Sequence, residues 1–107
     1  MMFRVKELAR ARADIRDIAT WLAERSPQGA ASWLDAYDRL VARLGQSAES
    51  FGSAAENEDC AFDIRQALFK TGRGRVYRAI FYIDGDTVNI LRVRGPGQAL
   101  VQPDELG

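Results

Sequence analysis

The sequence contains no histidine and only one cysteine, Cys60, among its 107 residues. Without histidine the chain lacks the commonest general base and the commonest metal ligand, and it cannot form a Ser-His or Cys-His nucleophile pair. One cysteine cannot form an intramolecular disulfide, and a lone cysteine does not make a zinc site. We therefore expect no metal and no cofactor, in a protein of the reducing cytoplasm.

Long apolar runs and an excess of charge of one sign are also missing. No segment approaches the roughly 20 apolar residues that a membrane span requires, and the first residues contain no apolar signal region. The 15 Lys/Arg residues equal the 15 Asp/Glu residues, which argues against a general nucleic-acid binder. With 47% hydrophobic residues, the composition is typical of one globular domain over residues 1–107, without membrane contact.

The zero net charge conceals a strong asymmetry along the chain. Residues 1–63 carry eight Lys/Arg and eleven Asp/Glu, whereas residues 64–94 carry seven Lys/Arg and two Asp/Glu. The second stretch therefore has a net charge of +5, against −3 for the first. A basic segment next to a mildly acidic remainder indicates that residues 64–94 contain the functional surface.

Hydrophobic periodicity predicts an α+β fold. Period-two alternation indicates strands, and apolar residues at i, i+3, i+4 and i+7 indicate amphipathic helices. We expect Ser26 to cap the second helix, with Pro27 in its first turn, and Gly45 to end it. The helices should form a hairpin that covers one face of a small, largely antiparallel sheet. The predicted order is β-α-α-β-β-β: strand 2–8, helices 9–25 and 27–44, and strands 64–69, 76–83 and 87–94.

Residues 45–61 show no periodicity and are rich in Ser, Ala, Gly and acidic residues. We expect a solvated loop with a short strand or helical turn near Phe51. Its three clustered acids, Glu56, Glu58 and Asp59, should be exposed.

The basic residues of the 64–94 stretch are the main candidates for a binding site, because guanidinium groups can grip phosphate oxygens bidentately. The register of the last hairpin decides which of them share a face. A three-residue loop at 84–86 places Arg78 opposite Arg92, which we favour, whereas a two-residue loop places Arg78 opposite Leu91. Like charges directly opposite each other are destabilising unless an anion or carboxylate lies between them. The alternative is that these are solvated arginines in surface pairs. The candidates are Arg65, Lys70, Arg73, Arg75, Arg78, Arg92 and Arg94.

The element order and the 64–94 stretch resemble the RelE/ParE superfamily of bacterial type II toxins. The resemblance covers nearly the whole chain and is most specific at Arg65, at Val76-Tyr77-Arg78, and at Asp84-Gly85-Asp86 with the strand that follows. It implies a toxin that a cognate antitoxin wraps and neutralises, in a hetero-oligomeric complex of the kind that stabilises plasmids.

The superfamily contains two activities, and the resemblance implies different roles for the residues in each. ParE-like members inhibit DNA gyrase, whereas RelE-like members cleave mRNA on the ribosome through attack of a ribose 2′-hydroxyl on the adjacent phosphate. In a RelE-like enzyme Arg78 would stabilise the charge on that phosphate, with Arg65 and Tyr77 as further catalytic candidates. The remaining cations would hold the RNA: Arg73, Arg75, Lys70, Arg92 and Arg94.

The sequence departs from the nuclease pattern after the last strand. Many relatives carry a His-Gly pair there, whereas this chain has Gly95-Pro96. A general base would have to be Tyr77, Tyr82, Lys70 or an acid such as Glu58. We therefore favour a ParE-like toxin that acts on gyrase by binding. The alternatives are a RelE-like ribonuclease and a detoxified module that only binds its antitoxin, so whether the protein is an enzyme stays open.

Overall fold

The computed structural model describes residues 2–59, 63–72, 74–96 and 98. It contains two helices and four strands in the predicted order, which confirms the α+β fold class. The helices are α1 (Ala9–Arg25) and α2 (Pro27–Ser47). The strands are β1 (Arg4–Glu7), β2 (Arg65–Phe69), β3 (Tyr77–Asp84) and β4 (Thr87–Arg94). Two short 3₁₀ helices, η1 (Ala48–Ser50) and η2 (Ala55–Asp59), lie between α2 and β2.

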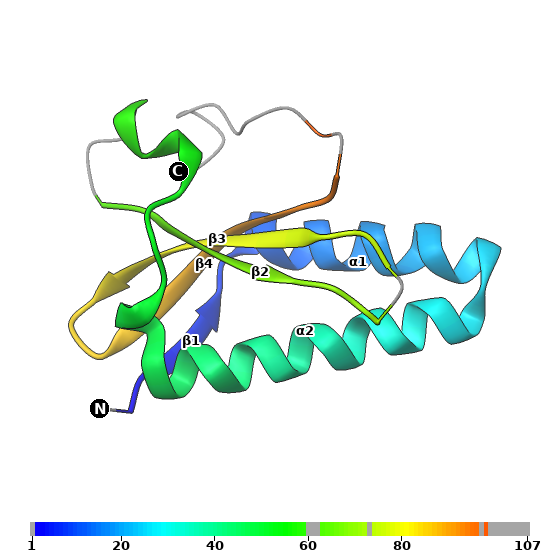
Figure 1. Ribbon diagram of the computed structural model, residues 1–107, viewed down its shortest axis with the longest axis horizontal. Coiled ribbons are helices and arrows are strands. Elements are labelled where there is room, and N and C mark those ends of the chain that lie inside the picture. The colour runs from blue at the N-terminus through cyan, green and yellow to red at the C-terminus, as the bar shows by residue number, and fades with distance from the viewer. Residues whose placement is uncertain (1, 60–62, 73, 97, 99–107) are drawn as a thin grey trace.

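The four strands form one sheet in the order β1-β4-β3-β2. The β4-β3 and β3-β2 pairs are antiparallel, and β1 lies parallel to β4. The parallel pair is possible because β1 and β4 are far apart in sequence, with the helical hairpin and two strands between them. In Figure 1, α2 runs beneath the sheet and η2 lies above it. We call the face opposite the helices the open face.

The start of α2 is as predicted, but its end is not. Ser26 accepts a hydrogen bond from the Gly29 amide at 3.0 Å, and Pro27 occupies the first turn. The predicted end at Gly45 is wrong, since the helix continues to Ser47. The Gly45 carbonyl accepts a hydrogen bond from the Phe3 amide at 2.7 Å, so this residue is where β1 joins the helix rather than where the helix stops.

The hairpin has the two-residue turn of the less favoured alternative, but neither predicted partner of Arg78 is correct. The turn contains only Gly85 and Asp86, and Gly85 has a φ of 62°, a conformation that favours glycine. Further along, an irregularity leaves Leu91 as an extra residue in β4, because Phe81 pairs with Ile90 and Ile80 with Arg92. Arg78 therefore lies opposite Arg94, neither Arg92 nor Leu91.

Two hydrophobic clusters fill the two sides of the sheet. The larger one packs the apolar stripes of both helices, including Leu40 and Leu44, against Phe81 and other residues of the sheet. A smaller cluster on the open face joins Ala54 and Ile64 of the 51–64 segment to Ile80 and Leu91. Residues 48–57 are therefore a packed part of the fold, with η1 next to Phe51 as predicted.

No helix in the described part of the chain combines the length and apolarity needed to cross a lipid bilayer. Among the same residues, no group of three or more acidic, histidine or cysteine side chains is arranged to hold a metal ion.

Candidate functional site

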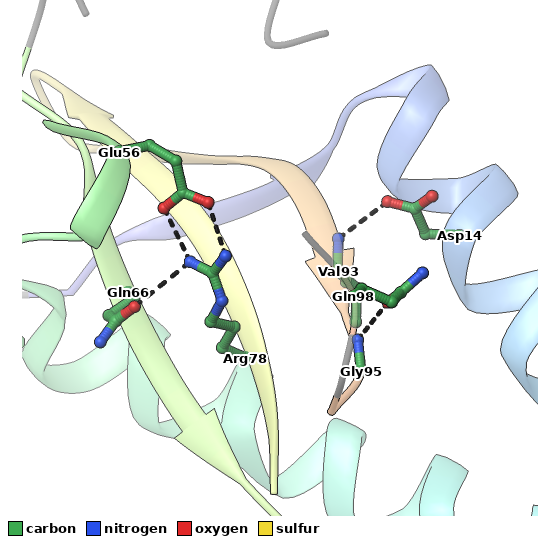
Figure 2. A network of polar contacts seen from close by, with 7 residues as sticks. All are labelled: Asp14, Glu56, Gln66, Arg78, Val93, Gly95 and Gln98. Carbon is green, nitrogen blue, oxygen red and sulfur yellow. Dashed lines mark hydrogen bonds and ion pairs between the residues drawn. The ribbon is translucent and has the colours of Figure 1, made fainter. Parts of the chain in front are cut away.

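Arg78, at the centre of the predicted site, is held by a carboxylate of its own chain. Its two terminal nitrogens donate to the two oxygens of Glu56 at 2.7 and 2.5 Å, and one of them also lies 3.4 Å from the Gln66 side-chain oxygen (Figure 2). The Glu56 side chain is only 2% exposed and that of Arg78 only 17%. A bidentate, largely desolvated pair of this kind is strong, because little water competes for either charge.

Local hydrogen bonds fix Glu56 in this position. The Ala54 amide donates to the Ile64 carbonyl at 3.0 Å, and the Asn57 side chain accepts from the Ile64 amide at 2.8 Å. These bonds tie both sides of Glu56 to the residue before β2. The prediction of an exposed acidic cluster is therefore wrong at Glu56.

Arg92 is held in the same way by an acid of α1. Its Nε and Nη2 donate to the two carboxylate oxygens of Asp14 at 2.7 and 2.9 Å. Asp14 also accepts from the Val93 amide at 2.9 Å, a bond that Figure 2 shows. Because β1 pairs with β4 only as far as Ile90, Asp14 satisfies a strand amide beyond the end of that pairing.

Arg65 binds the backbone of the preceding loop. Its Nη1 donates to the carbonyl oxygens of Glu49 and Phe51 at 2.9 and 2.7 Å, and Asp63 lies 3.8 Å from its Nη2. The two carbonyl contacts attach η1 and the residue that follows it to the edge strand β2. The Arg65 side chain thus holds the loop in place.

The sheet separates the three residues that we considered catalytic. In the β2-β3 register, Arg65 pairs with Phe81 and Phe69 with Tyr77, both on the helix side, whereas Arg78 pairs with Leu68. Neighbouring residues of a strand point to opposite faces. Arg78 therefore lies on the open face, and the structure does not bring it together with Arg65 or Tyr77.

The other predicted cations are dispersed. Arg94 lies opposite Arg78 on the open face, while Lys70 and Arg75 are exposed near the β2-β3 turn. Arg73 lies outside the described residues, and the Glu58 side chain is also not described. Among the six residues of the predicted cluster that the structure describes, only Arg78 and Arg94 are cross-strand partners.

Tyr77 and Arg75 belong to a different environment, a hollow of about 720 Å³ at the helix-hairpin end of the molecule. Tyr77 packs edge-on against Trp33, with ring centroids 5.4 Å apart, and Trp21 on α1 is 52% exposed at the same hollow. Its aromatic and apolar lining suits side chains of another protein better than phosphate groups.

Together these contacts limit what the predicted site can do. Glu56 and Asp14 neutralise two arginines, and backbone carbonyls occupy a third. Sequence reasoning missed both acids as ion-pair partners. The charge asymmetry of the sequence could have pointed to them. Acidic residues of the first part can form ion pairs with basic residues of the second part when both belong to one fold.

Comparisons with known proteins agree with this fold. A chain in the structure of the chromosomal ParDE toxin–antitoxin system from P. aeruginosa matches with a TM-score of 0.69 and 23% identity, over 88% of this chain and 96% of that one. A chain of the RelBE2 toxin–antitoxin complex from Mycobacterium tuberculosis matches with a TM-score of 0.52 and 22% identity, over 89% and 99%. At these identities the two structures establish the shared fold alone. No curated protein matches the chain significantly.

The family model described as the ParE toxin of the type II toxin–antitoxin system parDE matches residues 5–99. This match begins at the second residue of β1 and ends beyond β4. It therefore covers all the helices and strands, apart from Arg4 at the start of β1. The chain therefore belongs to the ParE toxin family, within the RelE/ParE superfamily of toxin–antitoxin toxins.

Proposed function

We propose that this toxin arrests growth by binding DNA gyrase in the cytoplasm, and that it does not cleave RNA. The observation that carries the proposal is the internal neutralisation of Arg78 by Glu56. A ribonuclease of this superfamily would need that arginine to meet a phosphate whose negative charge grows in the transition state. Here a buried carboxylate already binds both terminal nitrogens of that arginine.

Two further features support a binding mechanism. The sequence has no histidine, and the tyrosine next to Arg78 in the chain, Tyr77, lies on the opposite face of the sheet. Several large apolar side chains are exposed, among them Trp21, Leu68 and Val76, and such side chains are suited to contact with a protein.

We also propose that a cognate antitoxin neutralises this chain in a hetero-oligomeric complex. The two similar structures come from toxin–antitoxin assemblies, which supports a partner of that kind. The same exposed apolar residues are available to the antitoxin, and binding there would also block the target.

A ribosome-dependent ribonuclease is the second candidate, and one observation favours it. Arg78 lies on the open face opposite a second arginine, Arg94, so displacement of Glu56 would release the Arg78 guanidinium for a phosphate in a basic setting. A third candidate is a module that has lost toxicity and only binds its antitoxin.

Induction of the chain in bacteria, with and without its antitoxin, separates the three candidates. We expect growth arrest that the antitoxin relieves, inhibition of supercoiling when the purified chain is added to gyrase, and intact mRNA by primer extension. Breaks in mRNA at the ribosomal A site with unaffected supercoiling would replace our proposal by the ribonuclease. Normal growth at full expression of folded protein would leave only the antitoxin-binding module.

A further inference from the structure

A second hollow lies on the open face, at the end of the sheet where β1 pairs with β4. Its volume is about 570 Å³, within the range of small-molecule pockets. The strand registers place its polar side chains in two rows across β1, β4 and β3. One row is Arg4, Thr87 and Asp84, and the other is Lys6, Asn89 and Tyr82. None of these residues takes part in the arginine pairs described above.

Asn89 is the informative residue of this hollow. The residue is only 7% exposed, and no hydrogen bond joins its side-chain amide to any other residue that the structure describes, but the amide is not among the fully buried unsatisfied groups, so it still reaches the hollow. An amide that is open to a hollow and not hydrogen-bonded to its own chain can both donate to and accept from a ligand there. Val88 and Ile90, its neighbours in β4, show the residue types that strand packing favours. An amide at this position is therefore suited to a ligand that enters the hollow.

The charges around Asn89 restrict the ligand further. Arg4 and Lys6 are exposed and share one face of β1, about 7 Å apart along the strand. Asp84 lies two strands away, roughly 10 Å across the sheet. A simple anion would be attracted by the two cations but repelled by the carboxylate. A complementary ligand carries an anion at one end and hydrogen-bond donors at the other.

We propose that this hollow binds one nucleotide unit. Its phosphate lies against Arg4 and Lys6, and its base places a polar edge on the Asn89 amide beside the Tyr82 ring. The Asp84 carboxylate accepts hydrogen bonds from ribose hydroxyls, as acidic residues do in dinucleotide sites. The site is distinct from the Arg78 pair, and it does not depend on which target the toxin inhibits.

The source of the nucleotide is either the free molecule or a nucleotide within a single strand, and a titration distinguishes them. The purified full-length chain is titrated by calorimetry with each of the four nucleoside 5′-monophosphates, with a single-stranded tetranucleotide of RNA or DNA, and with inorganic phosphate. We expect saturable binding of at least one nucleotide, at least tenfold tighter than phosphate. Tighter binding of the tetranucleotide assigns the site to a strand, and equal binding assigns it to the free nucleotide.

Variants locate the binding. Asn89→Leu should weaken nucleotide binding about tenfold or more, because it removes a two-bond contact to the base. Lys6→Gln should weaken it about two- to fivefold, as expected for one exposed charge. Lys70→Gln is the matched control, since Lys70 is also exposed but lies near the β2-β3 turn, and it should leave binding unchanged.

Three results would overturn the proposal. In the first, neither a nucleotide nor a tetranucleotide binds saturably. In the second, phosphate binds as tightly as the nucleotides. In the third, Asn89→Leu and Lys6→Gln change binding no more than Lys70→Gln does. Thermal unfolding of each variant confirms that it is folded. If Asn89→Leu does not fold, the exposed Lys6 decides the question alone.

Discussion

The carboxylate of Glu56 grips the guanidinium of Arg78 through two hydrogen bonds, at 2.7 and 2.5 Å, from a position that is almost fully buried. Arg78 also faces Arg94 across the β3-β4 pair, an arrangement that is unfavourable unless a negative group is close. Glu56 supplies that charge. The pair therefore explains how the sheet tolerates adjacent arginines, and it helps to hold Ala54 and its neighbours on the open face.

Removal of Glu56 should destabilise the fold. In Glu56→Gln the arginine stays largely buried without a counter-charge, and we expect the free energy of unfolding to fall by about 2–4 kcal/mol. Urea unfolding followed by circular dichroism measures the change. The control is Glu24→Gln, on an exposed carboxylate of α1 whose ion pair with Arg25 is 3.9 Å long, and its effect should be below about 0.5 kcal/mol. Equal effects of the two variants would show that the Glu56 pair contributes nothing particular to stability.

Asp14 should stabilise the fold in two ways, through its ion pair with Arg92 and through its hydrogen bond from the Val93 amide. Two substitutions separate the two contributions. Asp14→Asn retains an acceptor for the Val93 amide but loses the charge beside Arg92, whereas Asp14→Ala loses both. We expect losses of unfolding free energy of about 1–2 kcal/mol for the first and about 2–4 kcal/mol for the second. Asp17→Ala, three residues later in α1 at a 78% exposed side chain, is the control with little expected effect. Denaturant titration should show the largest loss of unfolding free energy for Asp14→Ala, a smaller loss for Asp14→Asn and the smallest for Asp17→Ala. Equal losses for all three variants would contradict the prediction.

Much of the fold could be predicted because it depends on local patterns. The stripe of α1, the Ser26 cap and the strand that begins at Thr87 each follow from residues near one another in sequence, and each element lies where the pattern indicated. The Gly45 prediction failed because a tertiary contact overrode a local rule. A glycine that commonly ends helices here lets β1 approach, and its carbonyl accepts a hydrogen bond from Phe3.

The candidate site could be predicted only in part, since its geometry depends on contacts distant in sequence. The basic stretch was recognisable, but the extra residue Leu91 shifted the register and moved Arg94 opposite Arg78. Glu56 and Asp14 are 22 and 78 residues from their arginines, and no periodicity connects them. Asn89 was recognisable only as a polar residue between Val88 and Ile90, and its burial needed the structure.

Tyr37 should make the stability of the protein depend on pH in the alkaline range. Burial and then the hydrogen bond from its hydroxyl to Glu7, at 2.6 Å, raise the pKa of Tyr37 far above its ordinary value. Above about pH 10 the unfolded chain loses the Tyr37 proton while the folded chain retains it. The stabilisation is therefore fully present below that pH and decreases as the pH rises, by about 1.4 kcal/mol per pH unit.

Comparison with Tyr37→Phe isolates this effect from other titrating groups. At pH 7 the variant should be less stable by about 1–3 kcal/mol, because Glu7 loses its hydrogen-bond donor. The difference between the two proteins should narrow as the pH rises above about 10. A difference that stays constant up to the pH of global unfolding would mean that Tyr37 ionises equally in both states.

The double variant Glu56→Leu/Arg78→Met separates the role of Arg78 in folding from any role in toxicity. Replacement of a buried ion pair by apolar residues of similar size is often neutral, so we expect the double variant to be more stable than either single variant. Under the gyrase proposal it should still arrest growth and inhibit supercoiling within about twofold of the parent chain, because the proposal gives Arg78 a structural role, as the partner of Glu56, and no role in the contact with gyrase. Under the ribonuclease alternative, loss of the phosphate-binding arginine should reduce cleavage by about a hundredfold or more. A folded double variant that still binds the antitoxin but no longer arrests growth would therefore reject the gyrase mechanism as stated here.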